Sequence, residues 1–320
     1  MKHILVIHTG GTISMHEANG QIIPDTHNPM HDIQFTTDTH MQVTSVDLFN
    51  LPSPHITPHH MLTLYQELKL RLPDYDGAVI THGTDTLEET AYFLDTMQLP
   101  KDKPIALTGA MRSSNEIGSD GLYNFSSALR VVANDKSIGK GVVVVMNDEI
   151  HAAKYVTKTH TKNVSTFQIP THGPLGLLTK QDILYFQIPE ERVRFELTCV
   201  SGTIPIIKAY AGMGEELLKL INPETIDGIV IEALGAGNLP PDSLTHIKEL
   251  TAIGIPVVLV SRCFNGIAEA VYGYAGGGVD LAVSGVMFVK ELNSQKARLK
   301  LLIALNSGLT GNELKTYIEG

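Results

Sequence analysis

Short runs of apolar residues alternate, along the first half of the chain, with segments in which apolar residues recur every three or four positions. The short runs predict strands at 3–9, 43–49, 77–82, 103–108 and 141–147. The intervening periodicity predicts helices. Because strands that alternate with helices form βαβ units, this half is predicted to fold around a mostly parallel sheet.

Three helices are predicted between those strands. The first begins at Thr57-Pro58, a capping residue followed by proline at the first helical position. Its buried stripe would be Met61, Tyr65, Leu68 and Leu72. Thr84-Asp85 is predicted to cap the second helix, and Ser119 to begin a third that runs to about residue 134. The buried face of the second would carry Leu87, Ala91, Leu94 and Met97.

The rhythm breaks at 188–203, which is predicted to be a linker with one extended piece. Strands at 204–210, 228–233 and 256–261 and helices at 241–252 and 294–306 are expected beyond it. The chain is therefore predicted to be an α/β protein with two domains. A larger N-terminal domain, 1–187, would hold a mostly parallel sheet flanked by helices, and a smaller α/β domain would occupy 204–320.

The segment from Met15 to about residue 40 is polar and contains Gly20, Pro24 and Pro29. A long stretch without apolar periodicity beside a predicted site is typical of a lid. We therefore expect a lid without regular structure there.

The chain carries 24 Lys and Arg against 34 Asp and Glu, a net charge of −10 at pH 7. This balance argues against binding to nucleic acid, which needs a basic surface, and against an anionic membrane. No run approaches the ~20 apolar residues of a membrane span, and no secretory signal is evident. Two widely separated cysteines, Cys199 and Cys263, are expected to be reduced and buried, and the protein to be cytoplasmic.

Two glycine turns carry the candidate chemistry. Thr9-Gly10-Gly11-Thr12 follows the apolar run Ile4–Ile7, and His82-Gly83-Thr84-Asp85 follows Ala78–Thr81. Glycine lets the backbone turn sharply at the strand ends, where open α/β sheets bind their ligands. Either threonine could simply bond the backbone of its own turn, but the two together predict a hydroxyl nucleophile. A phosphate-binding loop is disfavoured because neither glycine-rich phosphate motif is present.

Three features bear on that site: the Thr84-Asp85 pair, Lys158 and the histidines. Thr84-Asp85 could be only a helix cap, but free N–H groups and a carboxylate would together suit an α-amino acid. Lys158 could be an ordinary surface lysine; buried beside Thr84, it would favour the neutral amine, which can accept a hydroxyl proton. The fourteen histidines lack metal-ligand spacing, so no metal site is expected. Chemistry by a hydroxyl nucleophile requires no organic cofactor, so none is expected either.

The motifs resemble those of the bacterial L-asparaginases. Thr9–Ile13 and Thr81–Ala91 are similar to the two threonine signatures of that family. Further similar segments follow in order along the whole chain: Gly109–Arg112, Ser119–Gly121 with Asn124, Val145–Asp148, Val156–Thr159, Gly173–Gly176, Gly235–Leu239 and Gln295–Arg298. The resemblance implies hydrolysis of L-asparagine to L-aspartate and ammonia. It also implies a homotetramer, a dimer of dimers with each site at a contact between subunits.

The resemblance implies a catalytic role for four residues and a substrate contact at Gly11. Thr12 would attack the side-chain amide carbon of the substrate and form an acyl-enzyme. Thr84, Asp85 and Lys158 would form a hydrogen-bonded set. Thr84 would help to activate the nucleophile or water and support the oxyanion, and Asp85 would bind the substrate ammonium.

Two more substrate contacts are implied, together with three departures from the family pattern. Ser53 would hold the substrate carboxylate, and Asn238 would reach the site from a neighbouring subunit. No tyrosine precedes Tyr65, although many members carry one on the mobile loop; we hypothesise that Tyr272 or Tyr274 of a neighbouring chain substitutes.

The other two departures concern specificity. Pro54 stands where some relatives carry glutamine, and proline can supply neither an amide side chain nor an N–H. The place of a family glutamate that binds the ammonium falls near Ala275, with Glu269 nearby. With those contacts altered, a strong preference for asparagine over glutamine is expected.

The sequence also leaves three alternative functions open. A related amidotransferase acting on charged tRNA would need a basic face, which the charge of −10 argues against. A related amidase could act on glutamine or another small amide. A non-catalytic protein that binds amino acids in the same cleft would tolerate loss of the Thr12 hydroxyl.

Overall fold

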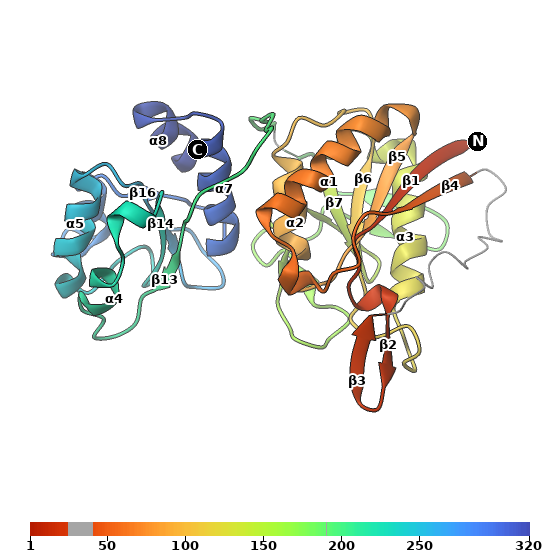
Figure 1. Ribbon diagram of the computed structural model, residues 1–320, viewed down its shortest axis with the longest axis horizontal. Helices are drawn as coiled ribbons and strands as arrows, with labels where there is room; N and C mark the ends of the chain where they lie inside the picture. Colours follow the sequence, from red (N-terminus) through yellow and green to blue (C-terminus); the bar gives the residue numbers. More distant parts are fainter. Residues whose placement is uncertain (25–40, 190) are drawn as a thin grey trace. The chain divides into compact units, whose positions relative to one another are not determined.

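The computed structural model describes residues 1–24, 41–189 and 191–320, which form two units, Met1–Glu196 and Leu197–Gly320. Each unit is built around its own sheet (Figure 1). The predicted α/β class, with a larger N-terminal domain and a smaller C-terminal one, is confirmed. The exact domain limits and the linker at 188–203 stay predictions.

The five predicted strands of the first unit form its parallel core: β1 (Lys2–His8), β4 (Met41–Asp47), β5 (Gly77–Thr81), β6 (Ile105–Thr108) and β7 (Val142–Met146). In the described part of the chain, the sheet order is β12-β11-β8-β7-β6-β5-β1-β4. Residues of β1 are buried on both faces because alternate side chains, such as Ile4 and Leu5, point to opposite layers. This explains why the strand is a continuous apolar run.

Three further strands extend the sheet with antiparallel pairing, which the sequence pattern did not predict: β8 (Glu149–Ala152), β11 (Gly176–Leu178) and β12 (Ile183–Tyr185). They are too short for a periodic signal. Asn147 and Asp148 make the tight turn between β7 and β8 with φ of 51° and 65°, the left-handed region that these two residue types tolerate. Tertiary contacts hold the β11–β12 edge in place.

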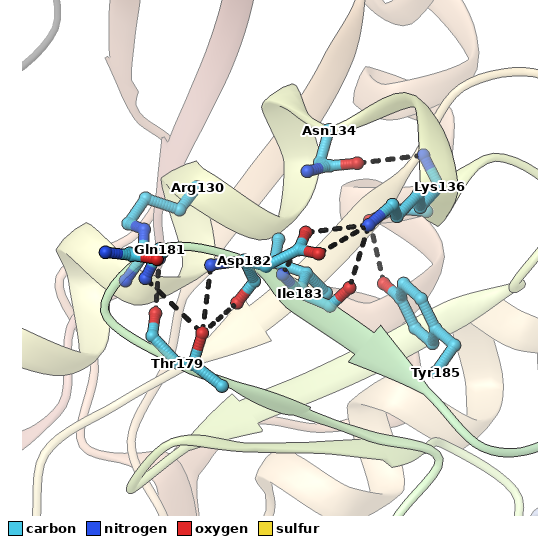
Figure 2. Close-up of polar contacts among 9 residues, drawn as sticks. Arg130, Asn134, Lys136, Thr179, Gln181, Asp182, Ile183 and Tyr185 are labelled. Atoms are coloured by element: carbon cyan, nitrogen blue, oxygen red, sulfur yellow. Dashed lines mark hydrogen bonds and ion pairs between the residues drawn. The ribbon is translucent and has the colours of Figure 1, made fainter.

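Figure 2 shows those contacts between the edge hairpin and the end of α3 (Gly121–Ala133). Lys136 Nζ donates to Asp182 Oδ1 at 2.7 Å, and Arg130 Nη2 donates to the carbonyl of Thr179 at 2.7 Å. Such exposed pairs each contribute about 1 kcal/mol or less, so they orient the hairpin more than they stabilise the domain.

The helices of the first unit follow the predictions closely, with two shifted starts. In α1 (Pro58–Arg71), the Thr57 cap forms a capping box with His60, and the predicted apolar stripe is buried. The prediction that Thr84-Asp85 caps the second helix is wrong, because α2 (Leu87–Asp95) begins after Thr86. Thr84 and Asp85 instead occupy the preceding turn, where other partners hold them. Likewise α3 begins at Gly121, two residues after the predicted Ser119, because Asp120 is its N-cap.

The expectation that the segment from Met15 lacks regular structure is wrong for its first part. Met15–Ala18 (β2) and Gln21–Pro24 (β3) pair as an antiparallel hairpin. Its tight turn places Asn19 and Gly20 at φ of 52° and 76°, which suits their left-handed conformation. The rest of the expected lid, residues 25–40, lies outside the described residues.

The second unit contains a parallel sheet of order β13-β14-β15-β16, made by Ile206–Lys208, Ile229–Ala233, Val257–Ser261 and Met287–Phe288. Its helices are α4 (Glu216–Lys219), α5 (Leu244–Ala252), α6 (Gly278–Val283), α7 (Ser294–Asn306) and α8 (Gly311–Glu319). The prediction of a helix at 294–306 is confirmed. The helix predicted from 241 starts as a short 3-10 turn, Pro241–Ser243, and becomes α-helical at Leu244.

Two remaining observations concern the cysteines and membrane-spanning helices. The prediction that the cysteines are buried is wrong: Cys199 and Cys263 are both exposed, since they lie on connecting segments and not on inward faces of strands or helices. Across the residues that the structure describes, no helix is long and apolar enough to cross a membrane.

Candidate active site

The two glycine turns lie at one edge of the sheet, at the carboxyl ends of the neighbouring strands β1 and β5. His8 at the end of β1 pairs with Thr81 at the end of β5. The backbone N–H of Thr9 and its Oγ1 both donate to the carbonyl of Thr81, at 3.1 and 2.9 Å. Adjacent parallel strands thus bring the two threonine motifs together, as strand order requires.

Close contact between the turns explains their glycines. Gly11 has a φ of +88°, and a Cβ added there would overlap the Cα of Gly83. Any other residue at position 11 would therefore both strain the backbone and push the turns apart. Thr12 follows directly and begins a 3-10 turn, Thr12–Ser14. Thr12 is thereby placed beside the second turn.

Lys158 reaches the second turn from the strand pair β9 (Thr157–Lys158) and β10 (Phe167–Gln168). Its Nζ donates to Thr84 Oγ1 at 2.9 Å and to Asp85 Oδ1 at 2.7 Å. Thr84 is buried, the Lys158 side chain is 16% exposed, and that of Asp85 is 59% exposed. One amine therefore links a sheltered hydroxyl to a carboxylate that also faces solvent.

Ser53 lies in the short turn Ser53–His55 before α1 and is buried. Its Oγ accepts from the backbone N–H of Asp85 at 3.1 Å, and its carbonyl accepts from Thr86 Oγ1 at 2.8 Å. Because Ser53 Oγ acts as acceptor toward Asp85, its own proton is available to donate to a ligand. The turn before α1 is thereby fixed against the turn before α2.

These residues line a cavity of about 720 Å³ in the first unit. The predicted residues in its lining are Gly11, Thr12, Ser53, Thr84, Asp85 and Lys158. The lining also includes residues for which no role was predicted: Met15, Ile22, Met111, Arg112, Glu116, Thr161 and Lys162. A signal existed for Met111 and Arg112, because they follow β6 and parallel strands end at one edge.

Asn238, a predicted substrate contact, lies outside this group. It belongs to the second unit, in the turn after β14, where its Oδ1 accepts from the backbone N–H of Gly278 at 3.2 Å. The lining of the first-unit cavity does not include it. Its contribution to a neighbouring subunit's site stays a prediction.

His82 holds the second turn through hydrogen bonds of its buried ring. Its ring is buried, with Nδ1 2.8 Å from the carbonyl of Gly83 and Nε2 2.9 Å from Thr90 Oγ1. Burial lowers the pKa of His82 from 6.5 to about 4, while the bond to Gly83 opposes that shift. The neutral ring therefore donates to Gly83 and accepts from Thr90 at neutral pH.

We expect stability against unfolding to fall as the pH drops from about 6.5 to about 4. Unfolded chains take up a proton at His82 with the ordinary pKa, whereas the folded protein keeps the ring neutral until the lower value. This loss of unfolding free energy is absent above pH 6.5 and reaches on the order of 3 kcal/mol below pH 4. Urea unfolding of the wild type and of His82→Gln between pH 7 and pH 4.5 measures it. An identical pH slope in both proteins would contradict the assignment.

The chain matches known proteins over its whole length. The family model described as "Asparaginase, N-terminal" matches residues 3–191, and "Glutaminase/Asparaginase C-terminal domain" matches residues 203–318. A protein described as "Probable L-asparaginase" from Deinococcus radiodurans is 39% identical, covering 98% of this chain and 96% of the relative. An L-asparaginase of Bacillus licheniformis is 34% identical, with 96% of each covered.

A solved structure adds a match in three dimensions. The crystal structure of a "Probable Cytoplasmic L-asparaginase" from Campylobacter jejuni has a TM-score of 0.85 to this chain at 29% identity. The match covers 99% of both chains.

Proposed function

Because this chain belongs to the asparaginase family, we propose that it hydrolyses L-asparagine to L-aspartate and ammonia through an acyl-enzyme on Thr12. Family membership supports an amidohydrolase that acts on asparagine. The observation that carries the finer mechanism is the double contact of Lys158 with Thr84 and Asp85, at the wall of the cavity that Thr12 also lines.

In the proposed first step, Thr12 Oγ1 attacks the side-chain amide carbon of asparagine. The hydroxyl proton passes to the leaving nitrogen, the carbon–nitrogen bond breaks, and ammonia departs. A threonine hydroxyl is a poor nucleophile unless a neighbouring group takes its proton. Negative charge develops on the amide oxygen, and backbone N–H groups near Gly11 and Thr84 are the candidate donors for it.

In the second step, water attacks the ester carbonyl, the Thr12 oxygen leaves with a proton, and aspartate is released. Thr84 is suited to orient this water because its hydroxyl is held by Lys158 Nζ. Lys158 can accept a proton from the attacking water, through the Thr84 hydroxyl, only as the neutral amine. Asp85 bonds Lys158 through Oδ1, which leaves Oδ2 for the substrate ammonium.

The substrate backbone is proposed to bind across the two turns before α1 and α2. Ser53 Oγ would donate to the substrate carboxylate, and Asp85 would accept from the ammonium. We further propose that Asn238 of a neighbouring subunit completes the site in a homotetramer. Tyr272 or Tyr274 remains our proposal for the loop tyrosine; their side chains are about half exposed. A cytoplasmic location is supported by the description of the Campylobacter jejuni relative.

An ammonia-release assay on purified protein tests the proposed function, with aspartate measured as the second product. Asparagine, glutamine and a panel of other small amides serve as substrates. Ammonia and aspartate in equal amounts from asparagine are expected. Tight binding of asparagine without ammonia would favour the non-catalytic alternative, and release from another amide alone would favour a different amidase.

We expect kcat/KM for asparagine to exceed that for glutamine by about 10- to 200-fold, the usual value of one methylene in a fitted site. Family membership leaves this open, because the C-terminal family description includes both activities. Here Pro54 lines the cavity without an amide side chain to adapt to a longer substrate. Steady-state kinetics on both amides measure the ratio, and a value near one would refute the preference.

A further inference from the structure

The loop between β6 and α3, residues 109–120, forms one wall of the cavity through Met111, Arg112 and Glu116. Its ends are held firmly. The carboxylate of Asp120 accepts from the backbone N–H groups of Met111 and Arg112, at 3.1 and 3.0 Å. The same carboxylate accepts from Asn124 Nδ2 at 3.0 Å, and Asn124 Nδ2 also donates to the carbonyl of Gly109 at 3.0 Å. The loop is thus a fixed support beside the site.

Two residues of this loop bind the β2–β3 hairpin. Asn115 makes a reciprocal pair of bonds with one residue: its Oδ1 accepts from the backbone N–H of Glu17 at 2.8 Å, and its Nδ2 donates to the carbonyl of Glu17 at 2.9 Å. Ser114 adds its backbone N–H and its Oγ, which both donate to the carbonyl of Met15, at 3.1 and 3.0 Å. All four bonds reach the same strand.

These bonds fall where the hairpin needs partners. Along an antiparallel pair, the backbone groups of alternate residues point away from the partner strand. Met15 and Glu17 are two residues apart on β2, so their backbone groups lie on the same outer edge. Ser114 and Asn115 pair with that edge as an added strand would, with the Asn115 amide in place of a peptide group.

The docked edge also determines which hairpin side chains line the cavity. Glu17 lies opposite Ile22 in the register, and directly opposed residues share one face of a hairpin, as do Met15 and Glu17 at a spacing of two. Met15 and Ile22 both line the cavity together with Thr12. The hairpin face that carries Met15 and Ile22 therefore lies toward the candidate nucleophile.

We propose that Asn115 is a positioning residue: its amide holds the β2–β3 hairpin on the 109–120 loop so that Met15 and Ile22 enclose the cavity beside Thr12. This role rests on the proposed asparagine hydrolysis. A two-stranded hairpin is marginal by itself, so its docked position depends on such contacts. Removal of the amide lowers the docked fraction, and the apparent affinity for substrate falls in proportion.

The test compares four variants of the full chain. Asn115→Ala removes both bonds to Glu17. Asn115→Asp keeps only the oxygen that accepts from the backbone N–H of Glu17. Ser114→Ala removes one of the two donors to the carbonyl of Met15. Asn134→Ala is the matched control, because it removes a solvent-exposed bond from the backbone N–H of Lys136 to an asparagine side chain at the other end of α3. The readouts are KM and kcat for asparagine, and the hydrogen-exchange rate of the Glu17 amide by NMR, which needs no activity.

For Asn115→Ala, we expect KM to rise about tenfold with kcat changed less than threefold, as loss of about two net hydrogen bonds would produce. The Glu17 amide should exchange faster. Asn115→Asp should restore its protection and part of the affinity, Ser114→Ala should have a smaller effect, and Asn134→Ala should leave both readouts unchanged.

Two results overturn the proposal separately. An unchanged exchange rate of the Glu17 amide in Asn115→Ala overturns the docking. Faster exchange with an unchanged KM overturns the positioning role. A wild type that releases no ammonia from asparagine overturns the proposed function itself, and the exchange measurement still decides whether Asn115 holds the hairpin.

Discussion

Replacement of Thr12 by alanine is expected to lower kcat for ammonia release by about 10⁴-fold or more, the usual cost of removing a catalytic nucleophile. The expectation follows from geometry: the Gly11 turn presents Thr12 to the cavity, beside the turn that holds Thr84. Without the hydroxyl no acyl-enzyme can form. Ammonia release, the circular dichroism spectrum and the unfolding midpoint should be measured together, since only the first should change greatly.

Two further variants sharpen the Thr12 test. Thr12→Ser keeps a hydroxyl and should retain far more activity than Thr12→Ala. Ser14→Ala removes the next hydroxyl of the same turn, whose Oγ donates to the carbonyl of Gly11 at 3.0 Å, and should cost stability more than rate. An adduct formed with an amide-derived electrophile should map to Thr12 by mass spectrometry. Activity of Thr12→Ala above about one hundredth of the wild type would move the nucleophile elsewhere.

Replacement of Lys158 by methionine should lower kcat by about 10²- to 10⁴-fold, the range that a general base contributes. Methionine keeps an unbranched apolar chain but cannot bond Thr84 or Asp85, so it removes both contacts of the amine. KM should change less, because the proposed substrate contacts of Asp85 and Ser53 remain in this variant. Steady-state kinetics on asparagine across a pH series measure the effect.

The companion variant Lys158→Arg separates proton transfer from charge. Arginine keeps the positive charge but cannot be deprotonated in a protein, so a base at this position is lost while electrostatic support remains. We expect Lys158→Arg to be nearly as slow as Lys158→Met. Recovery to within tenfold of the wild type would show that the charge suffices. Lys180→Met, at an exposed lysine in the β11–β12 turn, is the control.

The threonines of the candidate site can be predicted from the sequence, whereas its lysine cannot. Thr12 and Thr84 are predictable because each follows an apolar run by a glycine turn, and the ends of neighbouring parallel strands meet. Lys158 has no such signal. It lies on the two-residue strand β9, and no local apolar pattern predicts the pairing of β9 with β10.

Local propensity failed where a stronger tertiary contact prevailed. Thr84-Asp85 has the chemistry of a helix cap, but Lys158 and Ser53 hold these residues one turn earlier, and the helix starts after Thr86. The β2–β3 hairpin escaped notice because each of its strands is only four residues long, too short for a periodic signal. Its outer edge is satisfied by Ser114 and Asn115, which lie far along the chain.

The sequence alone determined the five parallel strands and three helices predicted for the first unit, the burial of their periodic apolar faces and the two glycine turns, because periodicity, caps and glycine act over a few neighbouring residues. Tertiary structure alone decided which distant side chains meet. Lys158 contacts Thr84 across 74 positions, and Asn115 contacts Glu17 across 98. Such contacts depend on strand order and loop docking, whose free energy comes from packing across the whole fold and leaves no local pattern to read.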